Sequence, residues 1–232
     1  MQEPILHLFN KYKFDHSLIG QIVTGDCFTA VMLKNGNIGI CGNTGHTVEP
    51  DKIDLNKPDL NIIEHRIILN AYYNAVLNYR NEYSIEKDVF DQVDFSVFKK
   101  IVMIGYFEST YAKFEKAGID VSVFDIDKTD PKLVPLAQEM EYVRNADAIM
   151  MTGTTLSNNT FQNLADNTKN GCQIYLTGPS AIMHLDMLAY KNIKTIMGSV
   201  FEPNDHRILE SIASGGCTKD FIKFGRKVVF EK

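Results

Sequence analysis

The sequence predicts an α/β protein in which a small N-terminal α+β unit precedes a parallel sheet covered by helices on both faces. Two observations predict this class. β-rich runs and a strongly apolar helix occupy the first 95 residues, whereas short apolar strands alternate with helical segments from residue 99 onward. Alternation of strand and helix is typical of a parallel sheet, whose crossover helices cover both faces. We therefore expect one domain over residues 1–95 and a second over residues 96–232.

The N-terminal domain is expected to contain a helix, a β-hairpin and a second, longer helix. Apolar residues recur at helical spacing between residues 5 and 12. Residues 20–42 contain two β-rich runs joined by Asn35-Gly36, the pair that best fits a type I′ hairpin turn. A polar loop follows, and residues 62–79 have the apolar pattern of a strong helix.

The C-terminal domain is expected to contain five strands in the order 2-1-3-4-5, which places the strand at 148–151 beside the strand at 101–104. This order would bring "GYFES" and "TGTTLSN" to one crevice at the edge of the sheet. The predicted strands lie within residues 99–107, 121–127, 146–153, 172–180 and 194–199. The predicted helices are residues 109–116, 133–142, 160–167, 181–189 and 206–213.

Composition and charge narrow the possible partners. The 232 residues are 44% apolar and 23% charged, with a net charge of -5, so nucleic-acid binding has no electrostatic support. No run of about 18 apolar residues is present, which predicts no membrane span. The N-terminus lacks the features of a signal peptide. Since the four cysteines lie far apart, we expect a cytoplasmic protein with reduced thiols, and a homo-oligomer stays open.

The ends of the predicted strands form the candidate ligand site, because ligands of open parallel sheets bind beyond the carboxyl ends of the strands. Three of four such ends turn on a glycine, which lets backbone amides approach a ligand closely. The candidate ligand-binding residues are Gly105, Tyr106, Phe107, Asp125, Thr152, Gly153, Thr154, Thr155, Asn158, Gly178, Pro179 and Ser180.

The stretch "TGTTLSNNT" combines many neutral hydrogen-bonding groups, and two interpretations compete. In the first, Thr154, Thr155 and Asn158 face a cleft between the domains and bind a ligand or water. In the second, the groups only cap a helix, with Asn159 as the capping residue and Gln162 three positions later. We expect Asn159 to cap in either case.

Other chemistry has weaker support in the sequence. Asp125 lies 20 residues after Gly105, as in dinucleotide-binding sites, but "GYFEST" lacks the second and third glycines of that motif. Ser180 sits where a nucleophile could lie, but helix capping is the favoured interpretation. Four acids could bind a hard cation or move a proton if two converged, although solvated turn acids are the alternative: Glu108, Asp125, Asp127 and Glu202.

Metal ligands are sparse in the sequence. Cys41 and His46 are the only weak candidates, and the alternative is a core cysteine and a solvated histidine. Cys172 is expected to pack in the core, whereas Cys217 is a candidate reactive thiol. We expect no dedicated zinc site, because the required ligand spacings are absent.

The C-terminal segment is expected to begin with a capped helix. Thr218 is the expected cap of this short helix after Gly215-Gly216. Arg226 and Lys227, which precede the final strand, are interpreted as surface charge or as partners of an anion.

The order of "IGYF", "VFDID", "ADAIMMTGTTLSNNT", "LTGPSA" and "SGGCTKDFIKFGRKVVF" resembles the family of proteins labelled putative heavy-metal chelation. "FTAVMLKNGNIGICGNTG" resembles the hairpin of that family and "ILNAYYNAVLN" its long helix, so the resemblance spans nearly the whole chain. It implies an enolase N-terminal-like domain paired with a Rossmann-like domain, with a cleft between them.

The favoured function is therefore binding of a small polar ligand, or of a metal held with such a ligand, in an interdomain cleft. One alternative is an enzyme that uses a nucleotide or S-adenosylmethionine-type cofactor on the Rossmann-like domain. The other is a non-catalytic interaction protein. Elemental analysis with native mass spectrometry would discriminate among the three.

Overall fold

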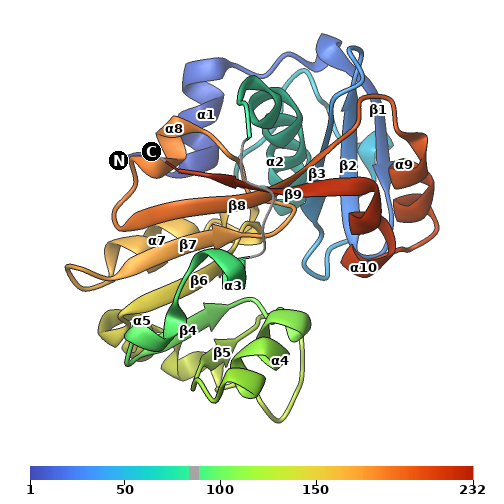
Figure 1. The fold of residues 1–232 in the computed structure, drawn as a ribbon. Helices are drawn as coiled ribbons and strands as arrows, with labels where there is room; N and C mark the ends of the chain where they lie inside the picture. The colour runs from blue at the N-terminus through green and yellow to red at the C-terminus, as the bar shows by residue number, and fades with distance from the viewer. Residues whose placement is uncertain (84–88, 232) are drawn as a thin grey trace.

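The computed structural model describes residues 1–83 and 89–231 and shows a mixed α/β fold built on two sheets (Figure 1). One sheet has three antiparallel strands in the order β1-β2-β3, and the other has six strands in the order β5-β4-β6-β7-β8-β9. Within the described residues, no helix is long and apolar enough to cross a membrane.

The N-terminal part contains one strand more than the sequence predicted. Its elements are α1 (Pro4–Tyr12), β1 (Ile19–Thr24), β2 (Phe28–Leu33), β3 (Ile38–Gly42) and α2 (Ile63–Leu77). The extra turn arises at residues 25–27, where Gly25 N–H donates to the Phe28 carbonyl. The predicted type I′ turn is wrong, because only Gly36 of the Asn35-Gly36 pair has a positive φ (90°), whereas a type I′ turn requires two such residues.

The predicted strand order of the larger sheet is confirmed. The first five of its strands, β4 (Ile101–Ile104), β5 (Ser122–Phe124), β6 (Ala148–Thr152), β7 (Gln173–Thr177) and β8 (Ile193–Phe201), take the order 2-1-3-4-5. Met103 of β4 pairs directly with Met150 of β6. β9 (Gly225–Phe230) adds an antiparallel sixth strand beside β8 and includes Arg226 and Lys227.

Two predicted helices are shorter than expected. Residues 133–134 stay extended because Val134 N–H donates to Val123 O, so α5 begins only at Glu139 (Glu139–Asn145). The residues after Ser180 also stay extended, because Asn74 of α2 and Asn78, directly after α2, take their hydrogen bonds, and α8 covers only Leu185–Leu188. The remaining helices are α3 (Val89–Gln92), α4 (Glu108–Ala117), α6 (Thr154–Ser157), α7 (Phe161–Asp166), α9 (His206–Ala213) and α10 (Thr218–Phe221).

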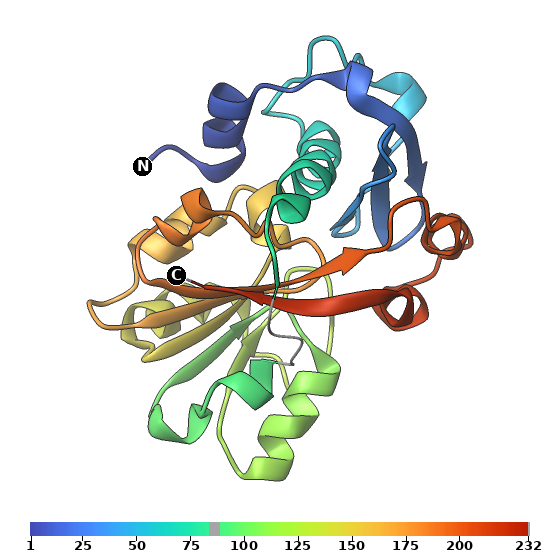
Figure 2. The same cartoon turned by 45° about the horizontal axis from the view of Figure 1, so that its top comes forward.

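Helices lie on both faces of the larger sheet (Figure 2), and apolar side chains are buried on each face. Val102, Ile149 and Ile174 share one hydrophobic cluster with residues of α2, α5 and α7. The alternating positions Met103 and Met150 belong to a second cluster that includes Phe114 of α4. This alternation follows from the two-residue period of a strand and produces a sheet buried on both faces.

The C-terminal helices pack against the N-terminal sheet. Ala30 and Ile40, from β2 and β3, share a buried cluster with Ile208 of α9 and Phe221 of α10. The three-stranded sheet therefore lies between α2 on one face and α9 with α10 on the other (Figure 1). The boundary between residues 95 and 96 stays a prediction.

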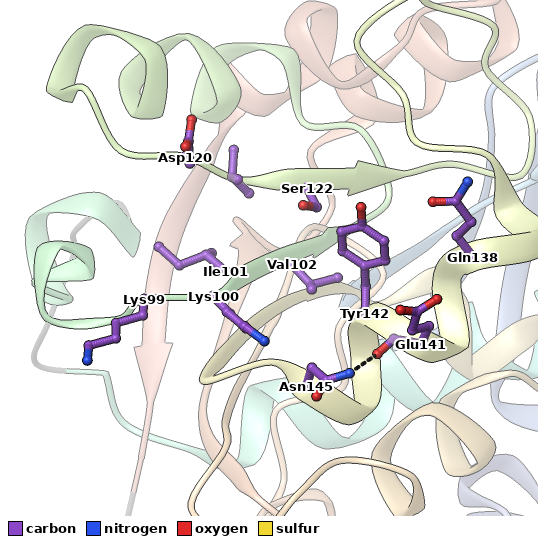
Figure 3. A pocket seen from close by; sticks show the side chains of 11 residues that line it. Lys99, Lys100, Ile101, Val102, Asp120, Ser122, Gln138, Glu141, Tyr142 and Asn145 are labelled. Atoms are coloured by element: carbon purple, nitrogen blue, oxygen red, sulfur yellow. Dashed lines mark hydrogen bonds between the residues drawn. The ribbon is translucent and has the colours of Figure 1, made fainter.

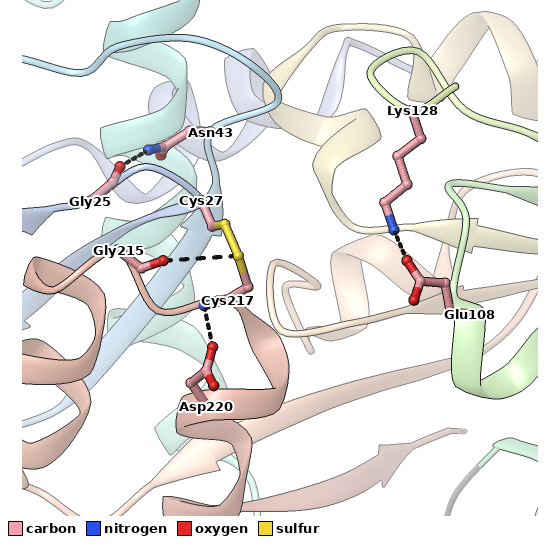
Figure 4. The surroundings of a disulfide bond; sticks show 8 residues. All are labelled: Gly25, Cys27, Asn43, Glu108, Lys128, Gly215, Cys217 and Asp220. Carbon is pink, nitrogen blue, oxygen red and sulfur yellow. Dashed lines mark hydrogen bonds and ion pairs between the residues drawn. A yellow bond between two sulfur atoms is a disulfide. The ribbon is translucent and has the colours of Figure 1, made fainter. Parts of the chain in front are cut away.

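The expectation of four reduced thiols is wrong. Cys27 and Cys217 form a disulfide with a sequence separation of 190 residues, whereas Cys41 and Cys172 are free and buried (Figure 4). Sequence spacing could not reveal this pair, because it depends on the packing of α9 and α10 against the β1–β2 turn. Cys217 also takes the N-cap position of α10 that was expected for Thr218.

Candidate functional site

A row of buried polar side chains on α2 joins the two sheets. Asn70 and Asn74 are fully buried and Arg66 nearly so in this mostly apolar helix, and the fully buried Asn78 follows its last residue as the C-cap. Their spacing of four residues places them on one helix face. The sequence reasoning missed this row, although the pattern R-x3-N-x3-N-x3-N in an apolar helix is a visible signal.

The row holds the chain after β7 in place. Asn74 Nδ2 donates to Pro179 O (2.9 Å) and Ala181 O (3.2 Å). Asn78 Nδ2 also donates to Ala181 O (3.1 Å), and its Oδ1 accepts the backbone N–H of Met183 (2.7 Å). Side-chain amides thus replace the secondary-structure bonds that this segment lacks.

Arg66 fixes the short helix after β6 in the same way. Its Nε donates to Ser157 O (2.6 Å), and its Nη2 donates to Leu156 O (2.8 Å). Glu3 balances its charge through a 2.5 Å ion pair. The helix α2 therefore positions the ends of both β6 and β7.

Cys41 lies inside this interface and does not meet the requirements of a metal ligand. Its Sγ accepts a hydrogen bond from Asn70 Nδ2 at 3.0 Å, and burial raises the pKa of the thiol. Burial and the raised pKa disfavour the thiolate form that binds metal. Asn70 also donates to Ser180 O, while its Oδ1 is buried without a partner among the described residues.

The end of β3 lies directly over the ends of β6 and β7. Gly42 N–H donates to Ser180 Oγ at 2.9 Å, and a Cβ on Gly42 would lie 2.9 Å from Thr154 Cγ2. Ser180 is 2% exposed and does not face solvent as a nucleophile, and His184 rather than Ser180 caps α8. The expectation that it begins a helix is wrong, because it serves as an acceptor between the two sheets.

The side-chain hydrogen bonds of Thr155 and Asn158 are local. The hydroxyl of Thr155 is buried and donates to Thr152 O (2.7 Å), so it is not available to a ligand. Asn158 Oδ1 accepts from the N–H and the hydroxyl of Thr160. Asn159 does not cap α7, because it has a left-handed φ of 63° and Thr160 takes the N-cap position, without a capping side-chain hydrogen bond. Likewise, Gln162 does not complete a capping box, because its Nε2 donates to Met1 O.

Two hydroxyls of this stretch are still partly exposed. Those of Thr152 and Thr154 lie 3.1 Å apart at the end of β6. Gly105, with φ 89°, turns the chain beside them, because a Cβ there would lie 2.8 Å from Thr152 Cβ. Gly153 is buried against Ser180 and Ala181, whereas Gly178 and Pro179 are partly exposed.

Asp125 is committed to its own surroundings. Its carboxylate accepts the N–H groups of Tyr106 (2.7 Å), Asp127 (2.9 Å) and Lys128 (2.9 Å). Lys128 Nζ donates to Tyr106 O and to Glu108. The carboxylate that a ribose would need thus already accepts three backbone N–H groups, and the partly exposed Tyr106 and Phe107 occupy the turn. Glu202, the fourth acid of the sequence-based group, is exposed at the end of β8.

A strained loop follows β3 and carries His46. Thr44 has φ 47° and Gly45 has φ 76°. A β-branched residue in this conformation is a genuine outlier. His46 Nδ1 lies 3.5 Å from Glu64 Oε1 of α2.

Asp127 faces the same loop. A Cβ on Gly45 would lie 3.5 Å from its Oδ1, and its carboxylate has no hydrogen-bond partner within the described ranges. Desolvation and the neighbouring Asp125 charge raise the pKa of Asp127, and His46 opposes them. The structure thus brings two carboxylates and an imidazole to this loop from three separate segments.

Glu139 is a further acid that the sequence reasoning missed. It begins α5, which follows β5 and therefore starts on the carboxyl side of the parallel strands. Burial raises the pKa of its carboxyl group. No partner is found for it among residues 1–83 and 89–231.

Preformed cavities lie elsewhere. A cavity of about 460 Å³ opens at the amino ends of β4 and β5 (Figure 3). It is lined by Lys99, Lys100, Ile101, Val102, Asp120, Val121, Ser122, Gln138, Glu141, Tyr142 and Asn145. A second, of about 300 Å³, lies beside β7 and β8. Nowhere in the described part of the chain do three or more His, Cys, Asp or Glu side chains already form a metal-binding group.

Comparison with known proteins finds a matching family model and similar solved structures. A family model described as "putative heavy-metal chelation" matches residues 88–231, which is more than half of the chain. A crystal structure of a protein of unknown function from Pyrococcus horikoshii is similar, with a TM-score of 0.79 and 20% identity over 92% of this chain and 93% of that one.

A protein of unknown function from Desulfitobacterium hafniense has a TM-score of 0.75 and 18% identity over 99% of this chain and 97% of that one. None of the curated proteins matches. Both solved structures come from the same family and support the fold alone.

Proposed function

The chain belongs to the family described as "putative heavy-metal chelation", and we propose that it binds a divalent metal ion together with a small polar ligand. The proposed site is the junction between the loop at residues 43–46 and the carboxyl ends of β4–β7. We refer to it as the tip site.

The observation that carries the proposal is the strained loop that holds His46. A positive φ at Thr44 costs free energy, and such strain persists where the surroundings impose it, often at functional sites. The strain places the imidazole beside Glu64 and near Asp127. The loop is thus held in an unfavourable conformation that gathers potential donors.

The donor types indicate the class of metal. An imidazole suits Zn²⁺, Ni²⁺ and related ions, and carboxylates suit harder cations. Soft thiolate ligands do not contribute, because Cys41 is buried and protonated. A borderline divalent cation such as Zn²⁺ is therefore the best match for His46, Glu64 and Asp127.

A second molecule would complete the coordination. The described donors do not already form a group of three placed for a metal, so the ion needs further ligands. The partly exposed hydroxyls of Thr152 and Thr154 at the end of β6 can donate to or accept from such a molecule. A small polar molecule with its own metal-binding oxygens meets both requirements.

The test measures Zn²⁺ binding by isothermal titration calorimetry with the Cys27–Cys217 disulfide intact, so that these sulfurs offer no thiolates. We expect His46→Ala to weaken Zn²⁺ binding about tenfold or more, since even an outer-shell partner of a metal ligand is commonly worth that much. His206→Ala is the matched control, because His206 is also exposed but lies at the start of α9. It should bind Zn²⁺ like the unmodified chain.

Equal Zn²⁺ affinities for His46→Ala and the unmodified chain would overturn the proposal. Glu64→Gln and Asp127→Asn extend the test, and each should weaken binding in the folded protein. Native mass spectrometry with elemental analysis of the purified chain tests the ligand, because metal and small molecule should leave together when a chelator is added.

A further inference from the structure

We propose that Cys27 and Cys217, once their disulfide is reduced, form a second site that binds a thiophilic metal ion or a trivalent arsenical. This site is separate from the tip site and does not rest on the function proposed there. It is built from the β1–β2 turn and from the loop between α9 and α10 (Figure 4).

These two cysteines are the most accessible of the four in the protein. Burial raises the pKa of Cys41, and burial raises the pKa of Cys172 to about 11, so both of those thiols are protonated and enclosed at neutral pH. Cys27 and Cys217 are instead partly exposed. Soft metal ions select thiolates, so this pair is the place where such an ion would bind.

The packing around the pair holds the two backbones together independently of the disulfide. A Cβ on Gly25 would lie 1.9 Å from Ile212 O, so the β1–β2 turn contacts the end of α9 at a distance that only glycine permits. Phe28 and Phe221, each close in sequence to one of the cysteines, form an edge-to-face pair with ring centroids 5.0 Å apart. Both elements also share the buried cluster around Ile208.

The backbone at Cys217 is fixed as well. Its N–H donates to the Asp220 carboxylate at 2.9 Å in the first turn of α10. The Cα atoms of the two cysteines are 5.5 Å apart. Reduction therefore leaves two thiols that are already facing each other, and such preorganisation favours binding of one ion by both.

The number of sulfurs limits the class of ligand. Two thiols can hold a linear ion such as Hg²⁺ or an arsenic atom that already bears an organic group. A tetrahedral structural zinc needs four protein ligands. No group of three His, Cys, Asp or Glu side chains suited to a metal occurs in residues 1–83 and 89–231, so we do not expect such a zinc here.

The chemistry balances with a small dithiol as the reductant. The dithiol breaks the Cys27–Cys217 bond by thiol–disulfide exchange, which yields two protein thiols and the oxidised, cyclic disulfide of the reductant. Phenylarsine oxide then condenses with both thiols. Two As–S bonds form, and the arsenic-bound oxygen leaves as water with the two thiol protons, without any change in the oxidation state of arsenic.

The test uses phenylarsine oxide and native mass spectrometry on the full chain. A dithiol reductant is added to one sample and removed by anaerobic gel filtration before the probe. We expect one arsenical per reduced chain and none on the oxidised chain. Cys27→Ser and Cys217→Ser should each lose at least nine-tenths of this adduct, whereas Cys172→Ser should keep it.

Folding of each variant is checked by its thermal unfolding transition. Because a serine variant can lose stability, partial oxidation provides a second measurement on the unmodified protein. The amount of arsenical bound should rise in proportion to the reduced Cys27–Cys217 fraction, which peptide mapping measures.

Adduct formation on Cys41 or Cys172, or equal binding by oxidised and reduced chains, would overturn the inference. Failure of the tip site would appear differently. It would show as unchanged Zn²⁺ binding in His46→Ala with the disulfide intact, and it would leave the arsenical result unaffected.

Discussion

Replacing Asn78 with alanine should destabilise the protein strongly, because this side chain makes three buried hydrogen bonds, two of them to the segment after β7. Its Nδ2 donates to Asn74 Oδ1 (2.8 Å) and to Ala181 O (3.1 Å), and its Oδ1 accepts from Met183 N–H (2.7 Å). Alanine leaves Asn74 Oδ1 and Met183 N–H without partners. Ala181 O keeps its bond from Asn74.

The magnitude follows from those two unpaired groups. Each buried donor or acceptor left unsatisfied costs about 1–3 kcal/mol. Two such groups predict a loss of about 2–6 kcal/mol in the free energy of unfolding, and we expect a value of about 4 kcal/mol. That is a large share of the roughly 5–15 kcal/mol by which domains are stable.

Urea denaturation followed by circular dichroism measures this loss. Asn145→Ala is the matched control, because the Asn145 amide also donates to a backbone carbonyl, that of Glu141, but is exposed. The control should change stability by less than about 0.5 kcal/mol. A loss below about 1 kcal/mol for Asn78→Ala would refute the reasoning, since water would then replace the amide without cost.

Two further predictions concern pH. Burial would raise the pKa of Asp186, but hydrogen bonds from Lys11, His7 and Tyr12 outweigh it and lower this pKa to about 2. Because the pKa of Asp186 in the folded protein lies below the ordinary 3.8, the ionised carboxylate stabilises the fold above pH 3.8. This stabilisation is lost as the pH falls toward 2. Asp186→Asn should therefore be less stable at pH 6 and show a flatter acid limb in urea unfolding, and an unchanged limb would contradict the assignment. Burial raises the pKa of Glu139 above its ordinary 4.5, so ionisation of this carboxyl group opposes folding as the pH rises above that value. Glu139→Gln should therefore raise the free energy of unfolding at pH 7. A lower free energy of unfolding in the variant would show that the carboxylate has a favourable partner.

Local patterns in the sequence were sufficient for most of the larger sheet. The apolar runs around Met103 and Met150 predicted buried strands, and the alternation with helices predicted their parallel order. Both features depend on side-chain periodicity along a few residues, which a sequence displays directly. The helix over residues 206–213 was predicted with its observed bounds for the same reason. The core position of Cys172 is also confirmed.

Local patterns were misleading where distant residues supply the hydrogen bonds. The segment after Ser180 has a helical pattern, yet Asn74 of α2 and Asn78, which follows α2, keep it extended. Ser180 and Asn159 have the composition of helix caps, but the first bonds Gly42 and the second takes a left-handed conformation. Capping propensity competes with such tertiary bonds, and the sequence around one residue contains no information about the competitor.

The sequence by itself determined the fold class, the strand order and the ends of β4, β6 and β7 as the edge where candidate residues gather. Only the tertiary structure decided which polar groups stay available there. Thr155 and Asp125 are satisfied by their own turns, whereas His46 and Asp127 approach each other from opposite halves of the chain. The Cys27–Cys217 pair likewise joins residues separated by 190 positions. Periodicity reports which face of an element is buried, but the partner of a particular side chain depends on long-range packing that no local pattern contains.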